Sequence, residues 1–496
     1  MKRSRIIVLC ILAALLLAAI VVVLRADRMA ERMVSERLTQ MSEEQQLPLS
    51  WSDIRIRLLH GSARVDSLAV QLNIPDSVKS DTTCVDILVP RLDIGRIHWL
   101  TLLRRRVVRV DRIRIKEGSV ALATRKDHTS LRLDSLMLAA YDIRYNLLDS
   151  SLTYNDSVYL LQAAHIDYTS ADGLFAAAVG SLHTEDAGSI VLTDIAGGNT
   201  DKKEEHAVRM GKQEVTWARF RLSEVRTSPV NIIRMALAKE VSLDTVSINA
   251  QMTDIYYDTH FPPKEPYPMP QEVLLAMKMP LQIKCMNATL GVLHLGMTSD
   301  GKHAGYLDLK KTNAHISNIS NAPGSTMHTN LTTHIGGSTV HITTDMKMNK
   351  RGTLTYQAEL ANLTGRDLRP LSEPLLGVEL NCNFHNITTK CEGDNESMHG
   401  TFCMRYDSLS LHVSDKGPVE ELSKFAWLVN SFSSIVLYNR NPRSDHEEPV
   451  SFDVSATRDP MQPFPAYFIA VINDGILQTI LPFGMGKGLM QKQKKK

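Results

Sequence analysis

The chain has 496 residues, with 56 Lys and Arg against 54 Asp and Glu, a formal net charge of +2, and six Cys. Its 43% hydrophobic and 22% charged residues exclude global disorder, collagen and a disulfide-packed miniprotein. The near-neutral charge balance argues against a dedicated nucleic-acid binder, whose domain normally carries a basic excess. At roughly 150 residues per domain, the length predicts about three domains, or one elongated body built of repeats.

The first predicted element is an apolar run from Ile6 to Leu24 that follows a basic stub. At about 1.5 Å per residue, a helix here covers roughly the 30 Å hydrocarbon thickness of a bilayer. The run leads into charged residues without a small-x-small cleavage site, which favours an uncleaved signal anchor over a cleaved signal peptide. The residues that mark the predicted span are Ile6, Leu12, Leu16 and Leu24.

The orientation of the anchor does not follow from charge alone, because basic residues flank the run on both sides. The short stub, set against a large downstream body of strand-rich character, places residues 1–5 in the cytoplasm and the body outside it. Five Cys lie outside the span, and an odd number cannot all pair internally. Spacing leaves room for one disulfide among Cys382, Cys391 and Cys403.

After the span, Met29 to Gln46 is charged and mildly amphipathic, which predicts a helix that ends before Pro48. From Trp51 onward the hydrophobic period becomes two, as it is in strands. Apolar residues at 113 and 115 and at 120 and 122 flank Glu117-Gly118, which predicts a hairpin with glycine at the turn. The first 150 residues therefore read as mostly short strands.

Two polar segments separate the strand-rich stretches. Residues 196–212 contain Gly-Gly, Asn, Asp, Lys and Glu, and indicate a loop or a domain boundary. Residues 258–270 contain five Pro, a density that excludes a helix interior and a central strand. The expected division is a stub at 1–5, an anchor at 6–24, a β-rich region at 25–195, polar and Pro-rich connections with intervening strands at 196–270, a second β-rich region at 271–413, and amphipathic helices with a basic tail at 414–496.

The alternation of apolar and polar residues is clearest between 340 and 413, where it predicts an antiparallel sheet with one apolar and one polar face. After Tyr406 the pattern slips by one residue and resumes at Leu409. An apolar face of this kind needs something to cover it. The candidate residues on that face are Val340, Ile342, Met346, Met348, Leu354, Tyr356, Leu360, Phe402, Met404 and Tyr406.

Few predicted helices are available to cover this face. Glu420 to Leu437 has apolar residues at spacings of three and four, and Phe468 to Leu481 is a second apolar segment that ends at Pro482. Two helices cannot cover several hundred residues of sheet. The sheet therefore either closes on itself as a sandwich or barrel, or curls into a trough whose interior is filled by something else.

Motifs that carry catalysis or metal binding are weak in this chain. Gly296, Gly301 and Lys302 nearly complete a phosphate-binding loop, but His303 stands where Ser or Thr is required, so a hairpin turn is favoured. The cluster Cys382, His385, Cys391, His399 and Cys403 lacks a Cys-x-x-Cys knuckle, so ordinary strand residues or one disulfide are favoured over zinc. With no hydrolase or metalloprotease motif, we expect no catalytic residue, no metal and no cofactor.

Two basic segments have alternative explanations. The run of Arg between 104 and 114 either meets anionic headgroups or forms a solvated strand edge that resists aggregation, and the second is favoured. The lysine tail at 492–496 either holds anionic lipid or a partner, or is simply a soluble end.

The order of features resembles that of the AsmA-like envelope proteins. The segments that carry the resemblance are Leu49-Ser50-Trp51-Ser52-Asp53-Ile54, Gly61-Ser62-Ala63-Arg64-Val65, Val89-Pro90-Arg91-Leu92-Asp93-Ile94, Trp99-Leu100-Thr101-Leu102-Leu103 and 108–115. Later segments, 279–283, 314–321 and 400–409, look like the second half of the Bacteroidota members. The resemblance covers nearly the whole chain through loose apolar patterns and supplies no functional residue set.

The resemblance implies a mainly β protein: a transmembrane helix, then an elongated, curled antiparallel β-groove with a few amphipathic helices, two of them near the C-terminus. It implies a single-pass protein of the bacterial inner membrane, with its bulk in the periplasm, that shelters acyl chains and assists phospholipid transport or outer-membrane homeostasis. Its partners would be phospholipid or another acyl lipid, the inner membrane and an envelope protein, with no nucleic acid. The chain departs in length, because 496 residues make a trough too short to cross a periplasm alone. The alternative is a non-enzymatic anchored scaffold or assembly factor for outer-membrane proteins, which would bind its partner through a sheet edge.

Overall fold

The computed structural model of the chain describes residues 26–481 apart from 37, 41, 43–47, 77–80, 99–100, 102–104, 125–128, 147–151, 154–158, 186–187, 231–234, 236–238, 264, 414–436 and 445. The predicted anchor Ile6–Leu24, the predicted helix from Glu420 except its last residue, and the lysine tail lie outside the described residues. No helix in the described part of the chain is both long enough and apolar enough to cross a membrane.

The chain forms two compact units that divide between Ile195 and Ala196. Both units are mainly β, and helices are few. The first unit begins with a helix at residues 26–36, here called the N-terminal helix, which begins three residues before the segment predicted as helical and overlaps its first part. The strand β10 (Ser189–Asn199) spans the division.

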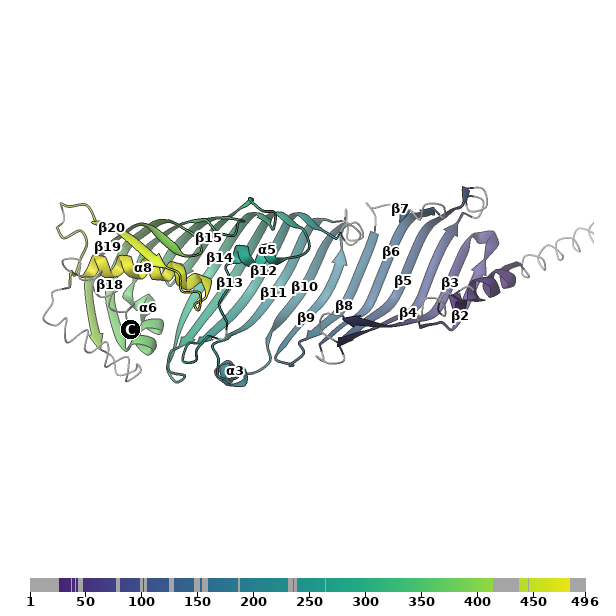
Figure 1. Cartoon of the computed structure of the whole chain (residues 1–496), viewed down its shortest axis with the longest axis horizontal. Helices are drawn as coiled ribbons and strands as arrows, with labels where there is room; N and C mark the ends of the chain where they lie inside the picture. Colours follow the sequence, from purple (N-terminus) through teal and green to yellow (C-terminus); the bar gives the residue numbers. More distant parts are fainter. Residues whose placement is uncertain are drawn as a thin grey trace, which may run out of the picture. The chain divides into compact units, whose positions relative to one another are not determined.

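The first unit is built on antiparallel strands in sequential order (Figure 1). From β3 to β9 each strand pairs with the next, except that β7 and β8 both pair with β6, and β1 and β2 both pair with β3. Its elements are β1 (Leu49–Ser50), β2 (Asp53–Arg57), the 3₁₀ turn η1 (Leu58–His60), β3 (Ser62–Asp76), β4 (Asp81–Ile97), β5 (Val107–Thr124), β6 (Ser130–Asn146), β7 (Leu152–Thr153), β8 (Tyr159–Thr169) and β9 (Phe175–Thr184).

The second unit contains strands whose registered pairings run in order from β11 to β20, and among the described residues β11 and β20 do not pair with each other. The sheet is therefore open. Its elements are α3 (Lys203–Arg209), β11 (Thr216–Pro229), β12 (Val241–Asp258), α5 (Pro270–Ala276), β13 (Leu281–Thr298), β14 (Ala304–Ser320), β15 (Thr326–Ile335), β16 (Ser338–Lys347), β17 (Leu354–Thr364), α6 (Gly365–Leu376), β18 (Val378–Gly393), β19 (Ser397–Val413), β20 (Ser451–Thr457) and α8 (Phe464–Ile480).

The expectation of a purely antiparallel sheet is wrong at one position. β12 and β13 are parallel, with Val241 opposite Leu281 and Asp258 opposite Thr298. Two parallel neighbours require a crossover connection, because the chain must return to the same end of the sheet. The Pro-rich segment supplies this connection together with α5, and its described residues between Thr259 and Met269 form no helix and none of the named strands, as the proline density predicts.

β-bulges divide many of the long strands. Ser67, Glu117, Ser135 and His165 each have φ between 53° and 56°, and β5 and β6 show register shifts around the second and third. The predicted hairpin at Glu117-Gly118 is therefore wrong: both residues lie inside one strand of 18 residues. A residue in the left-handed region produces the same sequence signal in a bulge as in a turn, but the strand continues and twists more strongly.

The sheet of the second unit is strongly curled. Helix α6 packs against both β18 and β14, which lie four strands apart in the pairing order. Four strand spacings span about 19 Å in a flat sheet, and a helix with its side chains is only about 10–12 Å wide. One helix touches both strands because the sheet bends around it.

Helix α8 lies on the curled sheet at its β17–β20 end (Figure 1). It begins four residues before the predicted apolar segment and ends one residue before that segment does. The buried cluster beneath it combines Tyr467 and Val471 of α8 with side chains of β16–β20 and with Met269, which precedes α5. This cluster is the main core of the second unit among the described residues.

Candidate functional site

The first unit carries a continuous apolar face across six strands. Val70 pairs with Ile87, which pairs with Val120, and the row continues through Leu133 and on to β8 and β9. We call this the Leu133 row, and its members are Val70, Ile87, Val120, Leu133, Ile166 and Val179. Five strand spacings make the row about 24 Å wide.

A second apolar row lies beyond the bulges on the same strands. We call it the Leu138 row, and its members are Val65, Leu92, Ile115, Leu138 and Leu161. Each bulge adds a residue to its strand, so the apolar side chains on both sides of it share one face. Because of this, the alternation is interrupted in the sequence while the apolar face is continuous in space.

The opposite face of the same strands is charged. Asp93 lies between Arg64 and Arg114 in the cross-strand register, and Arg64 Nε donates to Asp93 Oδ1 at 2.8 Å. Hydrogen bonds from Arg64 and Arg91 lower the pKa of Asp93 against the opposing effect of its desolvation. Charge on one face and aliphatic side chains on the other make this sheet a two-faced layer.

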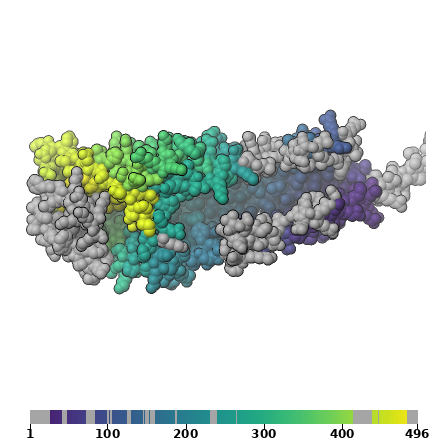
Figure 2. Space-filling model, viewed as in Figure 1, coloured from purple at the N-terminus to yellow at the C-terminus, as the bar shows by residue number. Residues whose placement is uncertain are grey.

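The Leu133 row is half-buried, although no helix of the described residues is shown to pack on it. None of its six members belongs to either buried cluster of the described residues. Figure 2 shows this unit, coloured purple to blue, hollowed on the face in view. Within the described part of the chain, the row is therefore a half-buried aliphatic surface outside both buried clusters.

The second unit has a corresponding row on β11–β16. We call it the Ile342 row, and its members are Val225, Ile248, Ala288, Ala314, Leu331 and Ile342. The outer face of these strands carries hydrogen-bonded polar side chains, such as His294 and Asp308 at 2.7 Å and His328 and Asp345 at 2.7 Å. At Ile342 the row reaches the edge of the buried cluster.

Most of the groove candidates predicted from the sequence lie under α8. Seven of them are at most 2% exposed, namely Met346, Met348, Leu354, Tyr356, Phe402, Met404 and Tyr406. Val340 is also buried, and Ile342 and Leu360 are partly buried against the same cluster. The chain's own side chains fill the concave face at this end, so the accessible apolar surface lies on other strands.

Close contacts between α8 and the sheet explain this burial. The rings of Phe468 in α8 and Tyr356 in β17 stack with centroids 4.2 Å apart. Gly475 lies directly against the ring of Phe402, where a Cβ atom would collide with the ring. Burial also raises the pKa of Tyr356 above its ordinary value. The absence of a side chain at Gly475 lets α8 approach the sheet.

Polar side chains of α8 close the free edge of β20. Asp474 Oδ2 accepts the backbone N–H of Ser455 at 2.9 Å, and Gln478 Nε2 donates to the backbone oxygen of Asp453 at 2.9 Å. An edge strand otherwise presents unpaired backbone groups to other chains. These two contacts satisfy such groups within the chain itself.

The N-terminal helix closes the edge of β2 in the same way. Glu31 Oε1 accepts the backbone N–H of Ile56 at 2.9 Å, and Asp27 Oδ1 accepts that of Leu58 at 2.9 Å. Between this helix and β2 lies an apolar pocket of about 440 Å³, here called the helix pocket. Its lining residues are Ala26, Met29, Ala30, Met33, Val34, Ile56 and Leu58.

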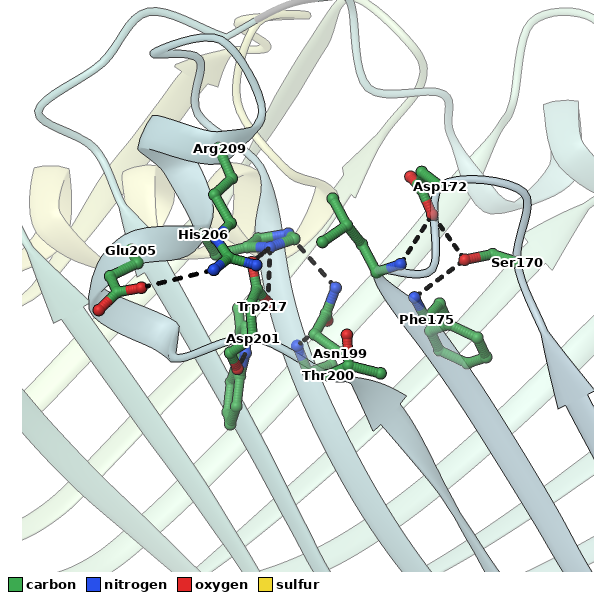
Figure 3. A network of polar contacts seen from close by, with 12 residues as sticks. Ser170, Asp172, Phe175, Asn199, Thr200, Asp201, Glu205, His206, Arg209 and Trp217 are labelled. Carbon is green, nitrogen blue, oxygen red and sulfur yellow. Dashed lines mark hydrogen bonds and ion pairs between the residues drawn. The ribbon is translucent and has the colours of Figure 1, made fainter. Parts of the chain in front are cut away.

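A buried polar network fixes α3 on the second unit (Figure 3). His206 Nδ1 lies 2.9 Å from Asp201 Oδ2, and His206 Nε2 lies 3.4 Å from the Asn199 amide nitrogen. Trp217 Nε1 donates to the backbone oxygen of Asp201 at 3.1 Å. Both imidazole nitrogens have partners within the protein, so we interpret the Asp201–His206 pair as a structural contact.

The remaining motif residues occupy ordinary positions. Cys382 and Cys391 are buried free thiols, Cys403 is a half-buried free thiol, and His385 pairs with Asp407 at 2.6 Å on the polar face. The Cys and His residues considered for a zinc site therefore do not come together. The near phosphate-binding loop is a turn between β13 and β14, in which Asp300 accepts backbone N–H groups. In the Arg-rich segment between residues 104 and 114, Arg109 Nε forms an ion pair with Asp142 Oδ1 at 3.3 Å.

Sequence reasoning missed the apolar rows of β3–β9 and β11–β15 as a site. These strands alternate between apolar and polar residues on each side of their bulges, but the alternation is clearest on β16–β19, where α8 and its neighbours cover the sheet.

Comparison with protein-family models and with curated proteins found no match for this chain.

Proposed function

We propose that this chain is a membrane-anchored envelope protein that carries lipid acyl chains on the uncovered apolar faces of its two units and so assists phospholipid transport or outer-membrane homeostasis. The observation that carries the proposal is the Leu133 row, six aliphatic side chains side by side with no described element packed over them. A contiguous apolar surface that the chain leaves uncovered is typical of a binding site.

The physical basis is transfer of methylene groups out of water. Each buried methylene contributes about 0.8 kcal/mol, so contact of about ten methylenes with an aliphatic face offsets a large part of the cost of leaving a bilayer. The charged outer face keeps the body soluble while the headgroup stays in water. No reacting group is needed for this activity, and we propose a role without catalysis.

The resemblance to AsmA-like proteins and the apolar run at Ile6–Leu24 support an inner-membrane anchor with a periplasmic body. The alternative role, an anchored scaffold that adds a partner strand at a sheet edge, has less support. The edges of β2 and β20 already hydrogen-bond to side chains of the N-terminal helix and α8.

The proposal is tested by lipid analysis of the full chain purified from membranes in mild detergent. We expect native mass spectrometry to detect bound phospholipid, and Leu133→Asp to lower its occupancy about tenfold, because a carboxylate on an apolar surface costs more than about 1.4 kcal/mol. Ala121→Asp is the matched control, because Ala121 lies one residue away from Val120 on the exposed face of β5.

Equal lipid occupancy in both variants would contradict the proposal, as would a wild-type chain without lipid. A circular-dichroism melt of each variant separates loss of lipid from loss of fold.

A further inference from the structure

The helix pocket combines features that the rest of the apolar surface lacks. It is bounded on one side by the N-terminal helix and on the other by β2, and its lining is apolar. Met29, Met33 and Val34 are 63%, 54% and 40% exposed, although each is a large apolar residue. Such a group of exposed apolar side chains next to a pocket indicates a site that meets apolar material.

The position of the helix in the chain identifies that material. The predicted span ends at Leu24, and the pocket begins at Ala26. Two residues of backbone reach at most about 7 Å, so the end of the pocket at Ala26 lies close to the surface of any bilayer that the span crosses. The apolar molecules closest to the pocket are therefore the lipids of that bilayer.

Charge around the helix is consistent with a phospholipid surface. Glu31 accepts the backbone N–H of Ile56 in β2, and Asp27 accepts that of Leu58 in η1. Arg28 and Arg32 are exposed, and guanidinium groups near a bilayer are attracted to anionic headgroups by about 1 kcal/mol each. Asp27 and Glu31 thus face the protein, while Arg28 and Arg32, together with Glu36, face water.

The floor of the pocket continues into the apolar face of the first unit. Ile56 and Leu58 line the pocket, and Ile56 also belongs to the buried cluster with Val65. Leu92 packs on that cluster, and Val65 and Leu92 begin the Leu138 row. An unbroken series of apolar contacts therefore runs from the pocket onto the sheet.

We infer that the helix pocket receives one acyl chain of a bilayer phospholipid and passes it to the Leu138 row. The pocket volume of about 440 Å³ lies within the range of small-ligand sites. Its two methionines are unbranched and adapt to chains of different shape. The inference rests on the proposed function and adds the place where lipid enters.

The test uses the full chain in nanodiscs of phosphatidylethanolamine and phosphatidylglycerol. A photoreactive phenylalanine derivative is placed at Met33 in the pocket, at Leu138 on the apolar face, or at Ala121 on the outer face. We expect crosslinks to phospholipid from the first two positions and none from the third.

The entry role is tested with the probe at Leu138 and a second change in the pocket. Met33→Asp is expected to lower lipid labelling at Leu138 about tenfold, because the carboxylate opposes passage of a hydrocarbon chain. Met33→Leu keeps an apolar side chain of similar size and should label like the wild type. Met33 is exposed, so neither change is expected to unfold the protein.

Two outcomes would overturn the inference and leave the proposed function standing: unchanged labelling at Leu138 in Met33→Asp, or labelling at Leu138 with none at Met33. Absence of lipid from Leu138 in the wild type would instead overturn both.

Discussion

Tyr356 and Phe468 stack with their ring centroids 4.2 Å apart and an interplanar angle of 20°, which fixes α8 to β17. Through this contact and its neighbours, the most strongly alternating strands of the sequence become the core of the second unit. The apolar surface that remains accessible lies on strands with a weaker sequence signal.

The stacking pair should couple energetically. In a double-mutant cycle of Tyr356→Leu and Phe468→Leu, we expect a coupling free energy of about 0.5–1.5 kcal/mol, as for other aromatic pairs. Urea unfolding of the wild type, the two single variants and the double variant measures this coupling. A coupling near zero would mean that α8 is not packed on β17 in solution. Asn473→Ala, on the exposed side of α8, is the control and should change stability little.

The two buried thiols should react slowly. Burial, with a smaller effect of the Asp407 charge, raises the pKa of Cys382 to about 12, and burial also raises that of Cys391. A raised pKa leaves little thiolate at neutral pH, so we expect both to resist Ellman's reagent until the chain is unfolded. Cys382→Ala and Cys391→Ala should lower the count of thiols only in urea. Rapid native labelling of either would show that α8 leaves this face open.

Asp407 should contribute pH-dependent stability. Hydrogen bonds from Ser408, Asn383 and His385 lower its pKa to about 2 from an ordinary value of 3.8. The folded pKa is depressed, so the contribution is present above about pH 4 and is lost as pH falls from 4 to 2.

Asp407→Asn tests this contribution. Its side chain is 42% exposed, so we expect a loss of no more than about 1 kcal/mol at pH 7. Urea unfolding at pH 7 and pH 2 should show the difference from wild type at the first pH and little at the second. A difference that is equal at both pH values would contradict the assigned cause.

Glu31 should protect the edge of β2. Glu31→Ala removes the acceptor for the Ile56 N–H, and a buried donor without a partner costs about 1–3 kcal/mol. Hydrogen exchange of the peptide that contains Ile56 should become faster. Glu31→Gln retains an acceptor oxygen and is expected to preserve most of the protection. Equal exchange in wild type and Glu31→Ala would show that the contact does not form in solution.

The period-two pattern of the sequence was sufficient to predict a mainly β protein with an apolar and a polar face. It also located the slip after Tyr406, where Ser408 has a φ of 58° and the β18–β19 register shifts. The helix at Phe468–Leu481 was predicted because an apolar segment ended by proline is readable without tertiary contacts.

Other features depend on tertiary contacts and left no readable pattern. The hairpin predicted at Glu117 is a β-bulge. A residue with positive φ next to glycine gives the same sequence pattern in a turn and in a bulge, so the sequence alone does not separate the two. The parallel pairing of β12 with β13 depends on where the connecting segment packs. The groove candidates were placed on β16–β19 because an alternating strand has the same sequence whether protein or another molecule covers it.

The left-handed residues of the long strands have a consequence for how this architecture varies. Ser135 and Glu117 set local twist through their backbone, at a cost of about 1 kcal/mol or more each, while Leu133 and Ile115 make one face of the sheet apolar. The curvature of the sheet and the apolar character of its face are therefore specified by different residues. A substitution such as Ser135→Gly changes the backbone preference at the bulge and leaves the aliphatic side chains in place, so the curvature of the sheet can vary while its apolar character stays fixed.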